Sequence, residues 1–236
     1  MKMSSIIIAA AVVAAVLLIT GCTFISVKGG KGNDKIFDRG NGVIVEKTFD
    51  IADFSKIELN VPADVEYEVA ENASMSVKID DNLLELLEVT SEGGTLTVSS
   101  TSKHIKRHHK LAITLTSSAL SSIICNGAVD FECNNGISAE DFSVQINGAG
   151  DIDIDGLKVT NASFQINGAA DLDIENLDAG SVSVEMNGAG DTDLSGKAGT
   201  VSVAIHGAGD VDLSNLEYEN LVKEIQGVGQ VKAGRK

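Results

Sequence analysis

The second half of the chain alternates apolar and polar residues with a period of two, interrupted by short glycine-containing stretches. Residues 142–146 (FSVQI) alternate, residues 147–150 (NGAG) interrupt the pattern, and residues 151–155 (DIDID) alternate again. This period is typical of β-strands with one buried face. It directs Ile152 and Ile154 toward a core and the aspartates of the same stretch toward solvent.

The glycine stretches recur at an almost constant spacing. Four Asn-Gly-Ala triplets are followed by His-Gly-Ala and Gln-Gly-Val, at successive spacings of 21, 20, 20, 19 and 20 residues. The residues that open these corners are Asn126, Asn147, Asn167, Asn187, His206 and Gln226. Each unit therefore predicts a strand, a glycine corner, a second strand and a looser return.

Two all-β architectures can use this pattern. Asn-Gly between alternating strands also favours hairpins, and thus an antiparallel meander or sandwich. In a parallel β-solenoid each unit would form one coil of about 20 residues, and like residues would stack about 4.8 Å apart. The near-constant spacing and the recurring corner residue favour the solenoid, because stacking turns the corner asparagines into a hydrogen-bonded ladder.

The first half follows the pattern less regularly. Residues 57–61, 65–69 and 75–79 alternate, whereas residues 81–87 predict one helical turn, capped by Asp81 or Asn82. Asn60 lies in a degenerate copy of the corner, 66 residues before Asn126, which suggests about three coils between them. We therefore expect a domain over 43–236, with irregular coils over 43–120 and regular repeats over 121–232.

The first residues have the features of an export signal. A short positive start precedes an apolar run from Ile6 to Ile19, which ends in Thr20-Gly21-Cys22. The run has the length of a signal-peptide core and is short for a membrane span. The ending resembles the lipobox of bacterial lipoproteins, so we predict a signal peptide over 1–21 and lipid attachment at Cys22. The polar, glycine-dotted residues 22–42 are expected to form a flexible tether.

Composition narrows the classes of function. The net charge is −16, the isoelectric point is near 4.5, aromatic residues make up 4% and tryptophan is absent. An acidic chain argues against nucleic acid as a partner. Of the remaining cysteines, Cys125 falls in the column of Ile146 and Cys133 in that of Ile154. Two buried thiols are favoured over a disulfide, although an exported protein permits a bridge.

The aspartates of the repeats are candidate metal ligands. Stacked coils would align them in ladders on one outer face, where the carboxylates repel one another by roughly 3 kcal/mol per pair before screening. A solvated acidic face is favoured over a calcium site, although calcium accepts many oxygen ligands. The candidates are Asp151, Asp153, Asp171, Asp173, Asp191, Asp193, Asp210 and Asp212.

A basic island over 103–110 (KHIKRHHK) stands out in the acidic chain. Lysines and arginine near His104 and His108 disfavour a metal site there. A charged loop or edge that resists strand pairing is the favoured interpretation. The alternative is a contact patch for an acidic partner, including the aspartate face of another copy, which would allow self-association.

The layout resembles the head GIN domain family of adhesin-like proteins, common in lipoproteins of Bacteroidetes. The resemblance rests on residues 42–46 (GVIVE), 57–69, 81–84 (DNLL), 94–98 (GTLTV) and the Asn-Gly-Ala-Gly-Asp series, and it covers about 42–233. It implies a right-handed parallel β-helix with an adhesin-like role, and it brings no catalytic residues.

The sequence thus predicts a non-catalytic, lipid-anchored envelope protein with a binding or scaffold role. We expect no cofactor, a membrane contact through the lipid, an unidentified envelope or extracellular ligand, and location at the outer membrane, facing either side. The alternatives are a polysaccharide lyase or hydrolase built on a β-helix, and a calcium-binding envelope protein. Three features argue against the enzyme: the short connections between strands, the even spread of the aspartates and the small number of aromatic residues.

Overall fold

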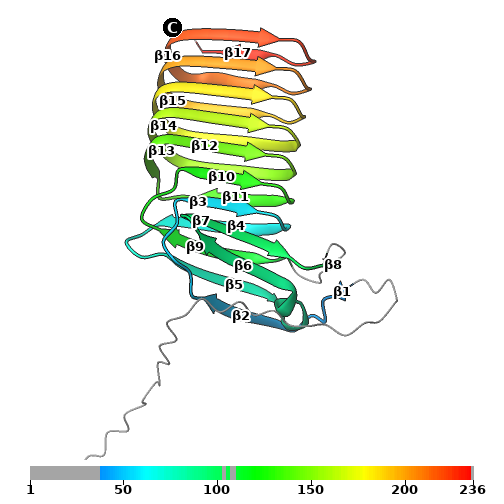
Figure 1. Ribbon diagram of the computed structural model, residues 1–236. Helices are drawn as coiled ribbons and strands as arrows, with labels where there is room; N and C mark the ends of the chain where they lie inside the picture. The colour runs from blue at the N-terminus through cyan, green and yellow to red at the C-terminus, as the bar shows by residue number, and fades with distance from the viewer. Residues whose placement is uncertain (1–37, 103–104, 107–109, 235–236) are drawn as a thin grey trace, which may run out of the picture. The chain divides into compact units, whose positions relative to one another are not determined.

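A computed structural model describes residues 38–102, 105–106 and 110–234 (Figure 1). The predicted signal peptide, Cys22 and most of the tether and of the basic island lie outside these residues. Within the described part, no helix is long and apolar enough to cross a membrane.

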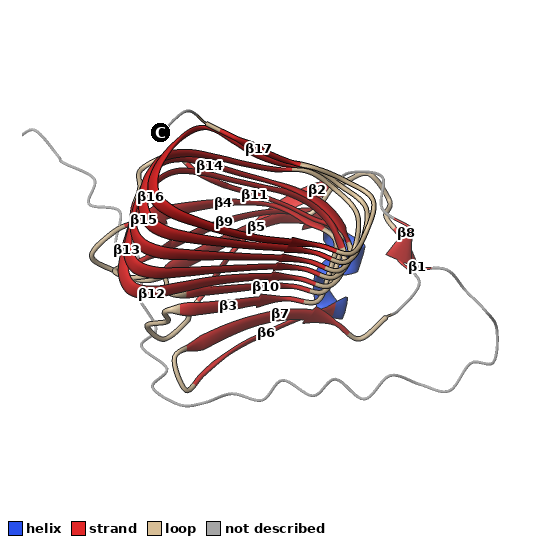
Figure 2. Cartoon of the chain, turned by 90° about the horizontal axis from the view of Figure 1, so that it is seen from above, coloured by secondary structure: helices blue, strands red, loops and turns tan. Residues whose placement is uncertain are grey.

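The repeats form a parallel β-solenoid, which confirms the predicted fold class. Strands of successive coils lie over one another (Figure 2). A single strand such as β13 runs from one glycine corner to the next and so makes a whole coil. The strands of the repeats are β10 (Ser122–Cys125), β11 (Val129–Cys133), β12 (Ile137–Ile146), β13 (Ala149–Ile166), β14 (Ala169–Met186), β15 (Thr192–Ile205), β16 (Val211–Ile225) and β17 (Val231–Ala233).

The preceding residues combine coils with antiparallel strands. Their elements are β1 (Asp38–Arg39), β2 (Ile44–Phe49), β3 (Lys56–Leu59), β4 (Ala63–Val69), β5 (Ser74–Asp80), the 3-10 helix η1 (Asp81–Leu86), β6 (Leu87–Glu92), β7 (Thr95–Ser100), β8 (Ile105–Lys106) and β9 (Ala112–Ser117). The helical turn is confirmed. No side chain caps its first residue, however, so the prediction that Asp81 or Asn82 caps it is wrong.

Alternation directs apolar side chains into the solenoid in register. Ile152 pairs with Leu172, and Ile166 pairs with Met186, so each column of inward residues continues through the stack. All four are fully buried. Each such side chain stabilises the fold by roughly 1.5–3 kcal/mol, and the columns together form one continuous core.

The first coils stack out of chain order. β3 and β4 lie directly beside β10 and β11, so Asn60 is one coil away from Asn126 rather than three. β7 and β9 form the next coil outward, and β5, β2 and β6 then pair antiparallel at that end. The described residues of 43–120 therefore include both stacked parallel strands and antiparallel strands. Alternation marks the buried face of a strand, but it specifies neither its neighbour nor its direction.

The last residues assigned to the tether are held by the domain. Gly42 donates its backbone N–H to the buried carboxylate of Asp80 (2.6 Å), and Asn41 donates its own to Asn82 Oδ1 (3.0 Å). β1 also pairs with β8. The polar residues at the start of η1 thus bind this segment instead of capping the helix.

Both cysteines face the core, as predicted from their columns. Cys125 pairs with Ile146 and Cys133 with Ile154, and both thiols are buried and free. Burial raises the pKa of Cys125 to about 12. These thiols therefore serve as small apolar side chains.

Candidate functional site

The asparagine corners stack into a side-chain ladder. Asn147 Nδ2 donates to Asn126 Oδ1 (2.8 Å), and Asn167 Nδ2 donates to Asn147 Oδ1 (2.9 Å). The ladder extends to Asn187 at one end and to Asn60 at the other. Its amides are occupied by one another, so this corner holds the coils together and leaves little for a ligand.

His206 and Gln226 continue the corner through their backbones. His206 N donates to Met186 O and Gln226 N donates to Ile205 O, each at 2.8 Å. The same backbone bond joins Asn187 to Ile166 in the asparagine coils. His206 thus takes a structural corner position.

The aspartates of the repeats form two columns on one outer face. Asp151 pairs with Asp171, and Asp153 with Asp173, which in turn pairs with Asp193. A shallow hollow of about 290 Å³ lies among them. Its lining residues are Asp151, Asp153, Asp171, Leu172, Asp173, Asp191 and Asp193.

Among the described residues, lysines form ion pairs at the two ends of this acidic face and none at its middle. At one end, Lys110 Nζ lies 3.0 Å from Asp64 Oδ1 and 2.8 Å from Asp130 Oδ2. At the other end, Lys232 Nζ lies 3.7 Å from Asp212 Oδ2. Lys110, the last residue of the basic island, thus forms ion pairs with the acidic face of its own chain.

The pKa values of the aspartates differ between the middle of the acidic face and its end near Lys232. Partial burial, followed by the charges of Asp173 and Asp151, raises the pKa of Asp153. Burial and then Asp212 raise the pKa of Asp193. By contrast, a side-chain hydrogen bond from Gln230 holds the pKa of Asp210 below its usual value.

Backbone groups of the next coil use some of these carboxylates. Asp191 N donates to Asp171 Oδ1 (2.8 Å), and Asp210 N donates to Asp191 Oδ1 (3.0 Å). Two carboxylates of this face therefore each have an oxygen that accepts a backbone hydrogen bond from the next coil. Within the described residues, no group of three or more His, Cys, Asp or Glu side chains is placed to hold a metal ion.

The acidic face predicts opposite effects for two asparagine substitutions. An aspartate with a raised pKa in the folded state lowers stability above that pKa, and this cost disappears as pH falls through it. We therefore expect Asp153→Asn to raise the free energy of unfolding at pH 7, by on the order of 0.5 kcal/mol at low salt. The gain should shrink at acidic pH and at high salt.

The matched variant is Asp210→Asn, which should lower stability at pH 7, because the folded state depresses the pKa of Asp210. Urea unfolding at pH 7 and pH 4 measures both variants. Shifts of the same sign at pH 7 would contradict this electrostatic account.

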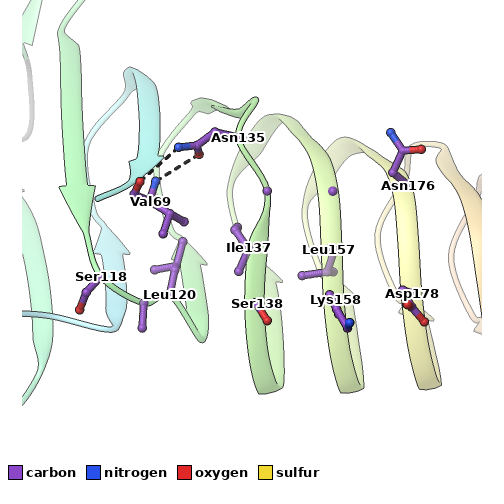
Figure 3. A pocket seen from close by; sticks show the side chains of 13 residues that line it. Val69, Ser118, Leu120, Asn135, Ile137, Ser138, Leu157, Lys158, Asn176 and Asp178 are labelled. Atoms are coloured by element: carbon purple, nitrogen blue, oxygen red, sulfur yellow. Dashed lines mark hydrogen bonds between the residues drawn. The ribbon is translucent and has the colours of Figure 1, made fainter. Parts of the chain in front are cut away.

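A groove of about 550 Å³ crosses neighbouring coils on another side (Figure 3). One wall is the loop over 118–120, which comes from the strand before the repeats. The opposite rim is the column Ser138, Lys158 and Asp178, contributed by three successive coils. Side chains of the rim are exposed or half-buried, so their polar groups are available to a ligand.

Apolar and polar groups share the lining of this groove. Leu120, Ile137 and Leu157 are buried beneath it. Asn135 closes one end by a pair of hydrogen bonds with the Val69 backbone, accepting from its N–H (3.1 Å) and donating to its carbonyl (3.2 Å) (Figure 3).

The groove lies at a second corner that the repeat analysis missed. Gly136 and Gly156 have positive φ angles of 78° and 92°, and Asn176 takes the equivalent place in the next coil with φ 52°. Gly196 also has a positive φ angle (124°), but a register shift pairs it with Leu177. Asparagine tolerates this left-handed region better than most residues. The signal was present in the sequence, because these four positions are spaced by 20 residues, but asparagine interrupts the run of glycines.

Lys158 differs from Lys197, the cation that follows Asp178 in this column. Asp178 Oδ2 lies 3.2 Å from Lys197 Nζ and so is already paired. Among the described residues, no carboxylate lies within ion-pair distance of Lys158. The groove therefore presents an uncompensated ammonium next to serine hydroxyls and apolar surface.

Comparisons with known proteins agree with the architecture. The family model for "Putative auto-transporter adhesin, head GIN domain" matches residues 53–176 and 157–235. A search of curated proteins finds no match.

Solved structures share the fold at low sequence identity. A "putative adhesin" from Parabacteroides distasonis is 19% identical, with a TM-score of 0.75 over 83% of this chain and 84% of that one. A "putative adhesin" from Bacteroides fragilis is 22% identical, with a TM-score of 0.69 over 83% and 99%. A "putative lipid binding protein" from P. distasonis is 18% identical, with a TM-score of 0.61 over 84% and 97%. The family match extends over most of the chain, and the chain therefore belongs to the head GIN domain family of adhesin-like proteins.

Proposed function

We propose that this protein is a non-catalytic binding module of the cell envelope, anchored in the outer membrane by lipid on Cys22. The observation that carries the binding role is the groove over the second corner, whose rim collects side chains from successive coils. A solenoid holds such side chains at a spacing set by its hydrogen bonds, so the groove is formed before a ligand arrives.

The chemistry of the groove favours an extended peptide segment with an acidic group. Lys158 offers a cation that forms no ion pair with the described residues, Ser138 and Ser118 offer hydroxyls, and the floor is apolar. No aromatic residue lines the groove, so it lacks the stacking platform on which sugar sites commonly depend.

The same lining argues against the enzyme alternative. Glycoside hydrolysis uses a pair of carboxyl groups on either side of the scissile bond. Asp178 is the one carboxylate among the residues that line the groove, and it is bound to Lys197. The names of the structural relatives, two of them "putative adhesin", point in the same direction.

One experiment on intact cells tests both parts of the proposal. The full chain is expressed in a Bacteroidetes host with a photo-crosslinking amino acid at Ser138, on the rim of the groove, or at Ser183, an exposed strand position, as the control. We expect a specific adduct only from Ser138, which Lys158→Gln weakens. The native chain should fractionate with membranes, whereas Cys22→Ala should release it to the soluble fraction.

Each part can fail separately. Equal adducts from Ser138 and Ser183, or an adduct that Lys158→Gln leaves unchanged, would refute the groove as the binding site. Membrane retention of Cys22→Ala would refute the lipid anchor. Release of unsaturated or reducing sugar from a pooled glycan substrate would establish the enzyme instead.

A further inference from the structure

The exposed large apolar side chains of the described chain gather at the two ends of the stack. At the end formed by the last coil, Val222, Ile225 and Val228 are 61%, 41% and 78% exposed. At the opposite end, Val43 directly precedes β2 and Ile44 is its first residue, and they are 55% and 42% exposed. Among the described residues, both ends also present unpaired strand edges, because there β2 pairs only with β5 and β17 covers only the first part of β16.

The edge of β16 carries a lysine in a column that is otherwise apolar. Lys223 pairs in register with Val203, which is buried, so its side chain starts from the core side of the strand. Leu221 and Ile225 flank it on the same side, in register with Val201 and Ile205. The inner face of this edge therefore has the pattern apolar, lysine, apolar.

The edge of β2 repeats this pattern. Lys47 lies opposite the buried Val77, and directly opposed residues of antiparallel strands share a face. Val45 and Phe49 flank it and pack against the core. β6, the other open edge at this end, contributes none of the large exposed apolar residues.

We propose that Lys47 and Lys223 prevent the ends of the solenoid from pairing with a second copy of the chain. Any register that matches the apolar flanks of two such edges places the two central residues opposite each other, in parallel or antiparallel strands alike. Joining two β16 edges would set Lys223 against Lys223, and joining β2 to β16 would set Lys47 against Lys223. Inward-pointing charges on edge strands oppose such pairing, because the ammonium groups would be brought together while losing water.

This role goes beyond the proposed binding function and does not depend on the groove. Anchored copies share one membrane plane and are therefore concentrated, which favours edge-to-edge contact. A stack with blocked ends keeps its sides free for a ligand, whereas open ends would lead to dimers or, through the head-to-tail contact, to filaments.

The test replaces each lysine with the core residue of its column. The full chain is purified in a non-ionic detergent, and its mass is followed by light scattering over a range of concentrations. We expect the native chain to remain monomeric, and Lys223→Val to lower the apparent dimer dissociation constant by at least about tenfold. Lys47→Val should promote association at the other end.

Three variants test whether the effect depends on the positive charge, on the position at an open edge and on the apolar surface at the end of the stack. Lys223→Arg keeps the charge and should stay monomeric. Lys56→Val makes the same change on β3, which lies between β7 and β10, and should also stay monomeric. Adding Ile225→Glu to Lys223→Val should return the monomer if the end surface is the contact. The proposal is overturned if Lys223→Val and Lys47→Val leave the mass of the native chain unchanged, or if the native chain already dimerises through these edges.

Discussion

Replacing Gly168 with alanine should lower the free energy of unfolding by about 4 kcal/mol, near the upper limit of single substitutions. A Cβ atom on Gly168 would lie 1.7 Å from the carbonyl oxygen of Gly148 in the preceding coil. Both atoms belong to the stacked backbone, so neither can rotate away. The corner must open or the coils must separate, and the neighbouring hydrogen bond from Ala169 N to Gly148 O (3.0 Å) would be disturbed.

The matched control is Gly93→Ala in the turn between β6 and β7. Gly93 has a φ of +59°, and a Cβ there would meet no atom within 4 Å. The left-handed conformation alone costs about 1–2 kcal/mol for alanine. Urea unfolding followed by circular dichroism measures both variants. A loss for Gly168→Ala no larger than that for Gly93→Ala would show that coil contact does not require this glycine.

The regular coils could be predicted because each one repeats the same physical constraints. Alternation directs Ile152 inward, the corner admits only glycine after asparagine, and Cys125 could be placed in the core by its column alone. The first half could not be predicted in the same way. Asn60 has the same local signals, but its position beside Asn126 depends on the order in which later strands join the stack. β7 and β9 pair with one side of β3 and β4, and the chain then returns as β10 and β11 on their other side.

Of the two candidate sites, one could be predicted from the repeat and the other could not. The acidic face follows from the repeat, since Asp153 and Asp173 share a column by spacing alone. The groove does not follow from the repeat, because the loop over 118–120 forms its wall and later coils form its rim. Such a surface is created by tertiary stacking, and no local pattern around Lys158 marks it.

Removing one whole coil should damage the protein less than removing half of one. Deletion of residues 167–186 joins Ile166 to Asn187, and Ile166 already pairs in register with Met186. The remaining coils can therefore close over the gap with every column intact, at the loss of one coil and its interface. Deletion of residues 167–176 removes half as many residues but leaves a coil too short to return to its corner.

The measurement is the urea unfolding curve of these two deletion variants beside the native chain, followed by circular dichroism. The parallel solenoid predicts that the twenty-residue deletion keeps strand content and a cooperative transition. It also predicts that the ten-residue deletion loses the transition or at least about 5 kcal/mol of stability. A cooperative, near-native transition for the ten-residue deletion, with collapse of the twenty-residue one, would contradict the stacking of one coil per repeat.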